Sequence, residues 1–147
     1  MTTLKKMDIP RFHLAFPVHD LDQARNFYAD LLGCGIGRES SQWIDFDLYG
    51  HQIVAHLSPK DCKITKRNMV DGDKVPSMHF GVILPWKKWK ELCEMIKEKT
   101  IDFLIEPKIR FKDASGEQGT FFIEDPSGNT LEFKTFKNDK DIFRKFE

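Results

Sequence analysis

Cysteine is scarce in this chain, and its three residues, Cys34, Cys62 and Cys93, are odd in number and far apart. No two of them form a Cys-x-x-Cys pair, so neither a disulfide framework nor a cysteine-based zinc site is expected. The chain also lacks an apolar run long enough to span a bilayer, and its first residues, MTTLKKMDIPR, lack the hydrophobic core of a secretion signal. These absences predict a cytoplasmic protein that does not enter a membrane.

An excess of charge of either sign is absent as well. The 23 Lys and Arg residues equal the 23 Asp and Glu residues, so no overall field attracts nucleic acid or an anionic membrane surface. Hydrophobic residues make up 40% and charged residues 31% of the chain, which is typical of a globular protein. A length of 147 residues allows a single domain, 1–147, in which two small modules share one core.

The first module, residues 9–57, is predicted to have the order βαβββ. Apolar residues alternate over Arg11–Val18, which predicts a strand with one apolar face. Asp20 followed by Gln23 matches a capping box, and apolar residues at helical spacing then continue to Gly33, where the helix ends. Further strands are predicted at Gly37–Ser40, Trp43–Leu48 and Gln52–Leu57.

The second module, residues 77–136, repeats this order. Ser77–Ile83 alternates like the first strand, and a helix begins after Pro85. The segments FHLA at 12–15 and MHFG at 78–81 match, which indicates two copies of one supersecondary unit. Further strands are predicted at Phe103–Ile105, Gly119–Glu124 and Thr130–Thr135.

Two segments lie outside the modules. Residues 58–76 are polar and contain Pro, Asp and Gly, so they are predicted to form a linker or an irregular crossover. Residues 137–147 form a tail that is predicted to include a last helical turn and has no evident function. The expected fold class is therefore α+β, with two βαβββ modules that form a curved mixed sheet around a trough.

Three side chains that commonly bind metals occupy related positions in the two modules. His13 and His79 lie on the first predicted strand of each module, and Glu132 lies on the last strand of the second. Each is flanked by apolar residues and so points to the face that the helices leave uncovered. Two imidazoles and one carboxylate that converge in a trough suit iron, nickel, zinc, cobalt or manganese, and they leave coordination positions open.

Each of these residues also has an ordinary interpretation. A single strand histidine among aromatic residues is more often a hydrogen-bonded core or surface residue, and a strand glutamate after a turn is usually just exposed. The three side chains, however, point to the same face of their strands and stand at related positions of the two modules. This agreement is the feature that favours metal binding.

The sequence also resembles a known superfamily. The stretches FHLA at 12–15 and FIEDPSGNTLEF at 122–133 are similar to vicinal-oxygen-chelate proteins, which include glyoxalase I, extradiol dioxygenases and bleomycin-resistance proteins. The resemblance covers residues 9–136, and the DPSGN turn followed by LEF is its most specific part. It implies that the metal ligands are His13, His79 and Glu132.

The function implied by this resemblance is that of a metal-dependent enzyme acting on a small substrate with two neighbouring oxygens. Residues 43–57 and 105–112 look closest to small extradiol-dioxygenase-like proteins. Two histidines and one carboxylate, with no glutamate from the first module, match the ligand set of non-haem iron(II) oxygenases, so ring cleavage with Fe(II) is the leading hypothesis, with Ni, Zn, Mn or Co as other metals. The alternatives are a glyoxalase- or isomerase-like lyase and a bleomycin-resistance-like drug-binding protein.

His56 is the candidate for proton transfer, with two other roles open. Glyoxalase I-like members usually have a fourth ligand, a glutamate, on the closing strand of the first module, where this sequence has no acidic residue. On that strand His56 points to the same side as Val54 and Ser58 and could take the place of the glutamate. It is, however, six residues after Gly50, whereas Glu132 is four residues after Gly128. It is therefore a fourth ligand, an acid/base or a structural residue.

Candidate substrate contacts surround the expected trough. The alternation of their strands points Trp43 and Phe122 into the trough, and Arg110 is placed at its mouth to anchor a substrate anion. The ordinary alternatives are core packing for the two aromatic residues and an edge-strand charge for the arginine.

A homodimer is expected, because half-sheets of this kind leave strand edges and apolar surface that favour a partner. Residues 58–76 are long enough for the modules to pair within one chain or between two.

Overall fold

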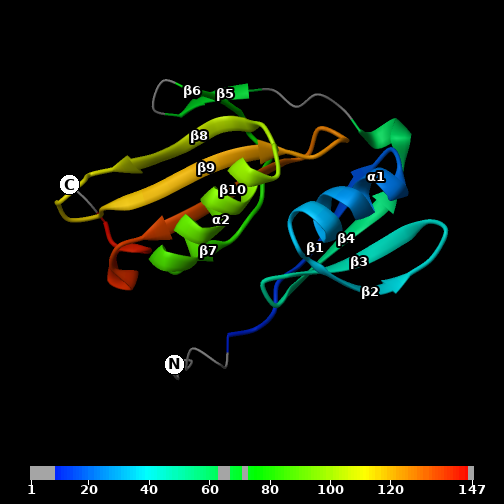
Figure 1. Cartoon of the computed structure of the whole chain (residues 1–147), viewed down its shortest axis with the longest axis horizontal. Coiled ribbons are helices and arrows are strands. Elements are labelled where there is room, and N and C mark those ends of the chain that lie inside the picture. The colour runs from blue at the N-terminus through cyan, green and yellow to red at the C-terminus, as the bar shows by residue number, and fades with distance from the viewer. Residues whose placement is uncertain (1–8, 63–66, 71–72, 146–147) are drawn as a thin grey trace. The chain divides into compact units, whose positions relative to one another are not determined.

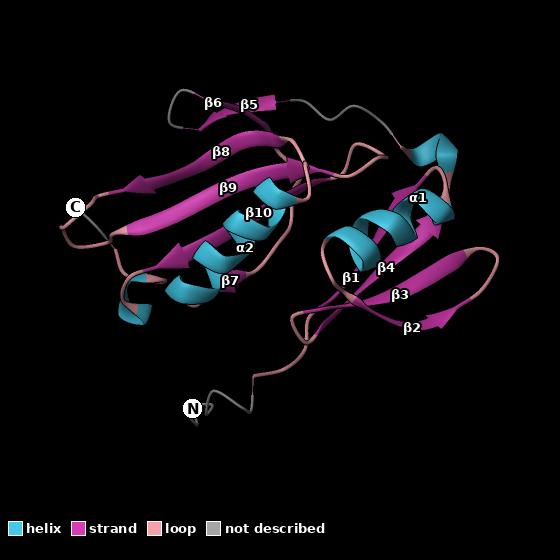
Figure 2. Ribbon diagram, viewed as in Figure 1, coloured by secondary structure: helices cyan, strands magenta, loops and turns pink. Residues whose placement is uncertain are grey.

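The computed structural model describes residues 9–62, 67–70 and 73–145. The chain divides into two compact units, Met1–Cys62 (unit 1) and Lys63–Glu147 (unit 2). Each unit contains a four-stranded mixed sheet and a helical segment (Figures 1 and 2). The predicted α+β fold of two βαβββ modules is confirmed.

Unit 1 follows the predicted order. Its sheet has the strand order β1-β4-β3-β2, in which β1 pairs with β4 in parallel and the other pairs are antiparallel. The elements are β1 (His13–Val18), α1 (Leu21–Arg25), its continuation η2 (Asn26–Leu31), β2 (Gly35–Glu39), β3 (Trp43–Leu48) and β4 (His51–Leu57).

The ends of the first helix are those that the sequence predicts. The Asp20 carboxylate accepts a hydrogen bond from the Gln23 backbone N–H at 3.0 Å, and this bond lowers the pKa of Asp20. Gly33 has a φ of +80° and ends the helical segment, which suits a residue without a Cβ. The turn Asn26–Leu31 is wound as a π-helix, a detail that apolar spacing does not reveal.

The two faces of the unit 1 sheet differ in chemistry. One face packs under the helical segment, where Tyr28 lies 5.3 Å from the Phe16 ring and 5.2 Å from the Phe46 ring, and all three are buried. Because strand residues alternate, the opposite face carries His13, Gln52 and His56. The helix therefore leaves the histidine-bearing face uncovered within this unit.

Unit 2 has the sheet order β7-β10-β9-β8. Its main elements are β7 (Ile83–Leu84), α2 (Trp86–Glu98), β8 (Phe103–Arg110), β9 (Gln118–Glu124) and β10 (Thr130–Phe136). In Figure 1, α2 lies along the sheet near β10. The Trp89 indole N–H donates to the Phe133 carbonyl at 2.8 Å and fixes the helix to that strand.

The first strand of module two is shorter than predicted. Regular strand geometry is limited to Ile83–Leu84, whereas the sequence predicts Ser77–Ile83. Phe80 nevertheless bridges Leu131 in parallel, and its N–H and C=O bond to Thr130 O at 3.1 Å and Glu132 N at 2.9 Å. The chain thus runs beside β10 from Phe80 onward but leaves regular strand geometry around Gly81.

The predicted linker contains two strands, so its description as irregular is wrong in part. β5 (Arg67–Val70) and β6 (Asp73–Pro76) form an antiparallel pair. Val75 is 1% exposed and forms a small core cluster with Ile105 and Phe122. The sequence Asp71-Gly72 is a strong hairpin signal. The strands were not predicted because the residues on either side of it are mostly polar and do not alternate.

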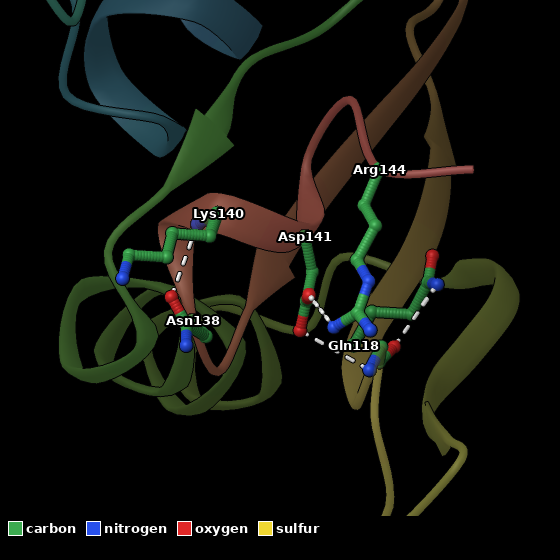
Figure 3. Close-up of polar contacts among 6 residues, drawn as sticks. Gln118, Asn138, Lys140, Asp141 and Arg144 are labelled. Carbon is green, nitrogen blue, oxygen red and sulfur yellow. Dashed lines mark hydrogen bonds and ion pairs between the residues drawn. The ribbon is translucent and has the colours of Figure 1, made fainter. Parts of the chain in front are cut away.

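The tail is hydrogen-bonded to the loop between β8 and β9 (Figure 3). After β10, the short turn η4 (Asp139–Asp141) begins at Asn138, whose side chain accepts from the Lys140 N–H at 3.0 Å. The buried Asp141 carboxylate accepts from the Gly116 N–H at 3.1 Å and pairs with Arg144. A last helical turn is therefore present, and its polar contacts anchor the tail to unit 2.

Helices that could cross a membrane are absent from the described residues, because none is both long and apolar enough.

The three thiols are expected to differ in reactivity. Burial raises the pKa of Cys34 to about 12 and that of Cys93 to about 11, so both stay protonated and unreactive at pH 8. Cys62 is only partly buried. We expect a thiol-reactive dye to modify one thiol quickly in native protein and three after unfolding, with the fast phase lost in Cys62→Ser. Rapid modification of all three in native protein would contradict the buried positions of Cys34 and Cys93.

Candidate metal site

His79 and Glu132 lie side by side on the face of the unit 2 sheet away from α2. The His79 Nε2 atom is 3.2 Å from Glu132 Oε1, and the two side chains are 29% and 17% exposed. Glu132 sits in the middle of β10, and His79 precedes the residue that bridges that strand. Two ligands predicted from separate strands are therefore neighbours.

The remaining polar atom of each side chain is already bonded within the unit. His79 Nδ1 lies 3.0 Å from the Pro76 carbonyl oxygen, which only accepts, so Nδ1 carries the proton. Glu132 Oε2 accepts a hydrogen bond from the Thr120 hydroxyl at 2.5 Å. These two bonds orient the pair so that His79 Nε2 faces a carboxylate oxygen of Glu132.

A cation between these two atoms fits this arrangement. Two lone pairs that face each other repel unless a proton or a metal ion lies between them. Ligand atoms about 2.0–2.2 Å from one ion are about 3.0–3.5 Å apart at the usual coordination angles, and the observed 3.2 Å falls in this range. The donor set and spacing therefore fit a divalent metal.

The chain backbone approaches this pair very closely. A Cβ placed on Gly81 would lie 1.6 Å from the Glu132 backbone oxygen. Only glycine permits the Glu132 N–H to reach the Phe80 carbonyl at 2.9 Å with this geometry. Gly81 is thus part of what positions the carboxylate.

Phe122 supports the histidine and is hardly accessible. Its ring meets the His79 ring edge-on at 5.3 Å and is 2% exposed. Val75 and Ile105 cover it in the same core cluster. The predicted direct substrate contact stays a prediction for Phe122, while the structure gives this side chain a packing role.

His13 lies in unit 1, in a comparable setting. Its Nδ1 atom is 2.7 Å from Gln52 Oε1, and its side chain is exposed. An amide oxygen only accepts, so Nδ1 carries the proton and Nε2 presents its lone pair. Each candidate ligand in the two units therefore has one atom held by a neighbour and one atom available.

The strand register bears on His56. His13 pairs with Gln52, whereas His56 pairs with Pro17, four positions along β1. At about 3.3 Å per residue this is about 13 Å, too far for His13 and His56 of one unit to share an ion. Val54, four residues after Gly50, occupies the place that corresponds to Glu132. This register disfavours the fourth-ligand role for His56.

The other predicted contacts lie on the same faces as the histidines. Trp43 pairs directly with His56 across β3 and β4, and the Arg38 guanidinium stacks 5.6 Å from its ring. Arg110 pairs with Gln118 at the far end of β8 and stacks on Phe111 at 4.8 Å. Their substrate-binding roles stay predictions.

Within the described residues, no group of three or more His, Cys, Asp or Glu side chains is close enough to hold an ion. The pair in unit 2 and His13 in unit 1 are the parts of the predicted ligand set that the two units contain.

Comparisons with known proteins decide the family. A sequence model of the Glyoxalase/Bleomycin resistance protein/Dioxygenase superfamily matches residues 12–133. The chain belongs to this superfamily. The resemblance seen in the DPSGN turn and the histidine-bearing strands is thereby confirmed, although a search of curated proteins found no match.

Solved structures support membership in the superfamily. A glyoxalase/bleomycin resistance protein/dioxygenase from Alicyclobacillus acidocaldarius is 36% identical, with a TM-score of 0.75 over 91% of this chain and 96% of that one. The fosfomycin resistance protein FosX from Listeria monocytogenes is 14% identical, with a TM-score of 0.65 over 97% and 99%. Lactoylglutathione lyase from Agrobacterium tumefaciens is 16% identical, with a TM-score of 0.59 over 86% and 92%. The last two share the fold.

Three contributors to the site were missed by sequence reasoning: Gln52, Thr120 and Gly81. Gln52 and Thr120 are cross-strand neighbours of the ligands, so their contacts depend on a register that local patterning does not define. Gly81 had a usable signal, because an isolated glycine inside a strand pattern indicates a close backbone approach.

Proposed function

We propose that this superfamily member is a metal-dependent enzyme that acts on a small substrate with two neighbouring oxygen atoms. The observation that carries the proposal is the pair of His79 and Glu132, whose facing atoms are 3.2 Å apart while their other atoms are held. His13, with its Nε2 available, is the proposed third ligand.

Each residue has a separate task in this proposal. His13 and His79 donate neutral nitrogen lone pairs, and Glu132 supplies the only negative charge of the set. A divalent ion held there would stabilise developing negative charge on the two substrate oxygens and, if it is iron, exchange electrons with dioxygen. Trp43 and Arg110 are proposed to contact the substrate ring and an anionic group.

Extradiol-like ring cleavage with Fe(II) is the proposed reaction, because two histidines and one carboxylate match the ligand set of non-haem iron oxygenases. Val54 supports three ligands over four, since it stands at the place that corresponds to Glu132. The glyoxalase-like lyase and the drug-binding protein are the alternative outcomes of the test below. A homodimer, with the ligands drawn from one chain or from two copies, is part of the proposal.

The test uses the full chain purified without a metal-affinity tag and freed of metal with a chelator. Anaerobic reconstitution with Fe(II), followed by addition of catechols, is expected to give oxygen uptake that Ni(II) and Zn(II) do not restore. Turnover of a hemithioacetal by Ni- or Zn-loaded protein without oxygen uptake would replace ring cleavage with lyase chemistry. Equal drug binding with and without metal, and no turnover, would support sequestration.

Sedimentation of a clean monomer at micromolar concentration would contradict the dimer.

His56→Ala is expected to keep metal affinity within about threefold of wild type and to slow turnover by about 10²-fold or more, as for loss of a general acid or base. Metal affinity is expected to be retained because His56 lies about 13 Å from His13 along the strands, too far to share an ion with it. Metal titration and steady-state kinetics measure the two effects. Lost metal binding would restore the fourth-ligand role, and unchanged turnover would leave His56 with a structural role only.

Thr120→Val removes the hydroxyl that holds Glu132 Oε2 and keeps the side-chain shape. Metal affinity is expected to fall about 10-fold, the lower end of the usual effect of losing such a supporting bond. Zn(II) titration by calorimetry measures the loss. The control is Thr135→Val, because Thr135 lies on β10 but donates its hydroxyl hydrogen bond to the Leu84 carbonyl on β7, away from the pair. An equal effect of both variants would show a general weakening of β10 instead.

A further inference from the structure

We infer that Gln52 is a positioning residue that sets the tautomer of His13, and that Asp45 orients Gln52 for this task. The inference rests on the proposed metal site, and it concerns how the chain prepares His13 for an ion. It is built on contacts within unit 1 alone.

The first step is the contact between His13 and Gln52. These residues are register partners on the parallel strands β1 and β4, so their side chains leave the same face next to each other. Nδ1 of His13 is 2.7 Å from Oε1 of Gln52. A proton on Nδ1 leaves the Nε2 lone pair unprotonated, which is the state a metal requires.

The second step is what prevents the Gln52 amide from turning over. Its Nε2 atom faces Asp45 Oδ2 at 3.4 Å, and Asp45 is only 8% exposed. A carboxylate accepts but does not donate, so a flipped amide would place oxygen against oxygen. The orientation that suits Asp45 is therefore the one that presents Oε1 to His13.

Arg38 completes this chain of contacts from the outside. Its Nε atom is 3.9 Å from Asp45 Oδ2, and its side chain is 86% exposed. An ion pair this exposed contributes little stability, so the contact that orients the Gln52 amide is the one made by Asp45 itself.

Unit 2 achieves the same result with different atoms. There the Pro76 backbone carbonyl holds Nδ1 of His79 at 3.0 Å. A backbone carbonyl stays when a side chain is replaced, whereas Gln52 is lost with a single substitution. The two histidines therefore differ in how easily their tautomers can be altered, and Gln52 is the adjustable position.

The experiment compares four full-length proteins freed of metal: wild type, Gln52→Leu, an exchange variant that combines Gln52→Glu with Asp45→Asn, and the control Gln42→Leu. The exchange variant keeps net charge and hydrogen-bond order, because the new carboxylate at position 52 would accept from His13 and the new amide at position 45 would donate to that carboxylate. Gln42 is an exposed glutamine in the loop before β3. ¹⁵N–¹H NMR at alkaline pH reports the His13 tautomer, and calorimetry with Zn(II) reports affinity.

Wild type, the exchange variant and the control are expected to show the Nδ1–H tautomer of His13 and Zn(II) affinities within about threefold of each other. Gln52→Leu is expected to lose the tautomer preference and about 10- to 100-fold in affinity. An Nε2–H tautomer in wild type would overturn the inference, as would affinity lost in Gln52→Leu with the tautomer unchanged. If wild type binds Zn(II) and Gln52→Leu binds it equally, this inference alone is wrong. If wild type binds no Zn(II), the proposed metal site is wrong and the inference falls with it.

Discussion

Replacing Glu132 with Gln is expected to weaken Zn(II) binding by at least about 100-fold. Glu132 is the only anionic residue of the proposed ligand set, and a neutral amide oxygen is a poor substitute for a carboxylate. Zinc bound by four protein ligands gains about 10–16 kcal/mol, so one ligand contributes about 3 kcal/mol, or about two powers of ten in affinity. Zn(II) calorimetry on metal-free protein measures the loss.

The fold of this variant should be intact, which separates a ligand role from a structural one. Gln has the shape of Glu, and the Thr120 hydroxyl can still donate to its side-chain oxygen. Thermal unfolding of the metal-free variant is therefore expected within a few degrees of wild type. Glu106→Gln, the same substitution at an exposed position of β8, is the control. A Zn(II) affinity equal to that of wild type in Glu132→Gln would remove Glu132 from the site.

The ligand candidates were visible in the sequence because a strand's alternation is local. The phase of His13, His79 and Glu132 follows from their immediate neighbours, and the covering helices follow from apolar spacing. The close approach of His79 to Glu132 confirms the shared face inside unit 2. Whether His13 binds the same ion as that pair stays a prediction.

The supporting contacts were not visible, because they join residues far apart in the chain. His13 and Gln52 are 39 positions apart, and Thr120 and Glu132 are 12 apart. Both contacts depend on strand register, which hairpin loops and parallel crossovers determine together. Counting from Gly50 and Gly128 did show that His56 lies two residues beyond the place equivalent to Glu132, so the hairpin glycines gave a partial register.

Errors in the predicted elements have local causes as well. The hairpin of β5 and β6 has few alternating apolar residues, although Val75 is a core residue that anchors it. Ser77–Ile83 alternates well, yet the close contact between Gly81 and Glu132 interrupts the regular strand. In both places a tertiary contact overrode the local pattern.

Gly81→Ala is expected to cause the largest loss of stability among single substitutions at this site. The new Cβ would lie 1.6 Å from the Glu132 backbone oxygen and 2.7 Å from its carbonyl carbon. Those atoms belong to β10, which pairs with β9 along its whole length, so they cannot move aside as a flexible side chain would. A loss of about 3 kcal/mol or more is expected, at the upper end of overpacking effects.

Urea unfolding measures this loss as a midpoint lowered by about 1–3 M, given a slope of about 1–3 kcal/mol per M. The matched control is Gly35→Ala, where the nearest atom to the new Cβ would be Asp47 Cβ at an ordinary 3.7 Å. Ala15 shows that a Cβ is tolerated at the corresponding position of unit 1, beside Val54.

Gly81→Ala should also weaken Zn(II) binding in the fraction that folds, because any shift of β10 carries Glu132 away from His79 Nε2. Stability within about 0.5 kcal/mol of wild type, the usual range for a surface substitution, would mean that the approach of these two backbone segments is much looser than described, and the positioning of Glu132 would need another cause.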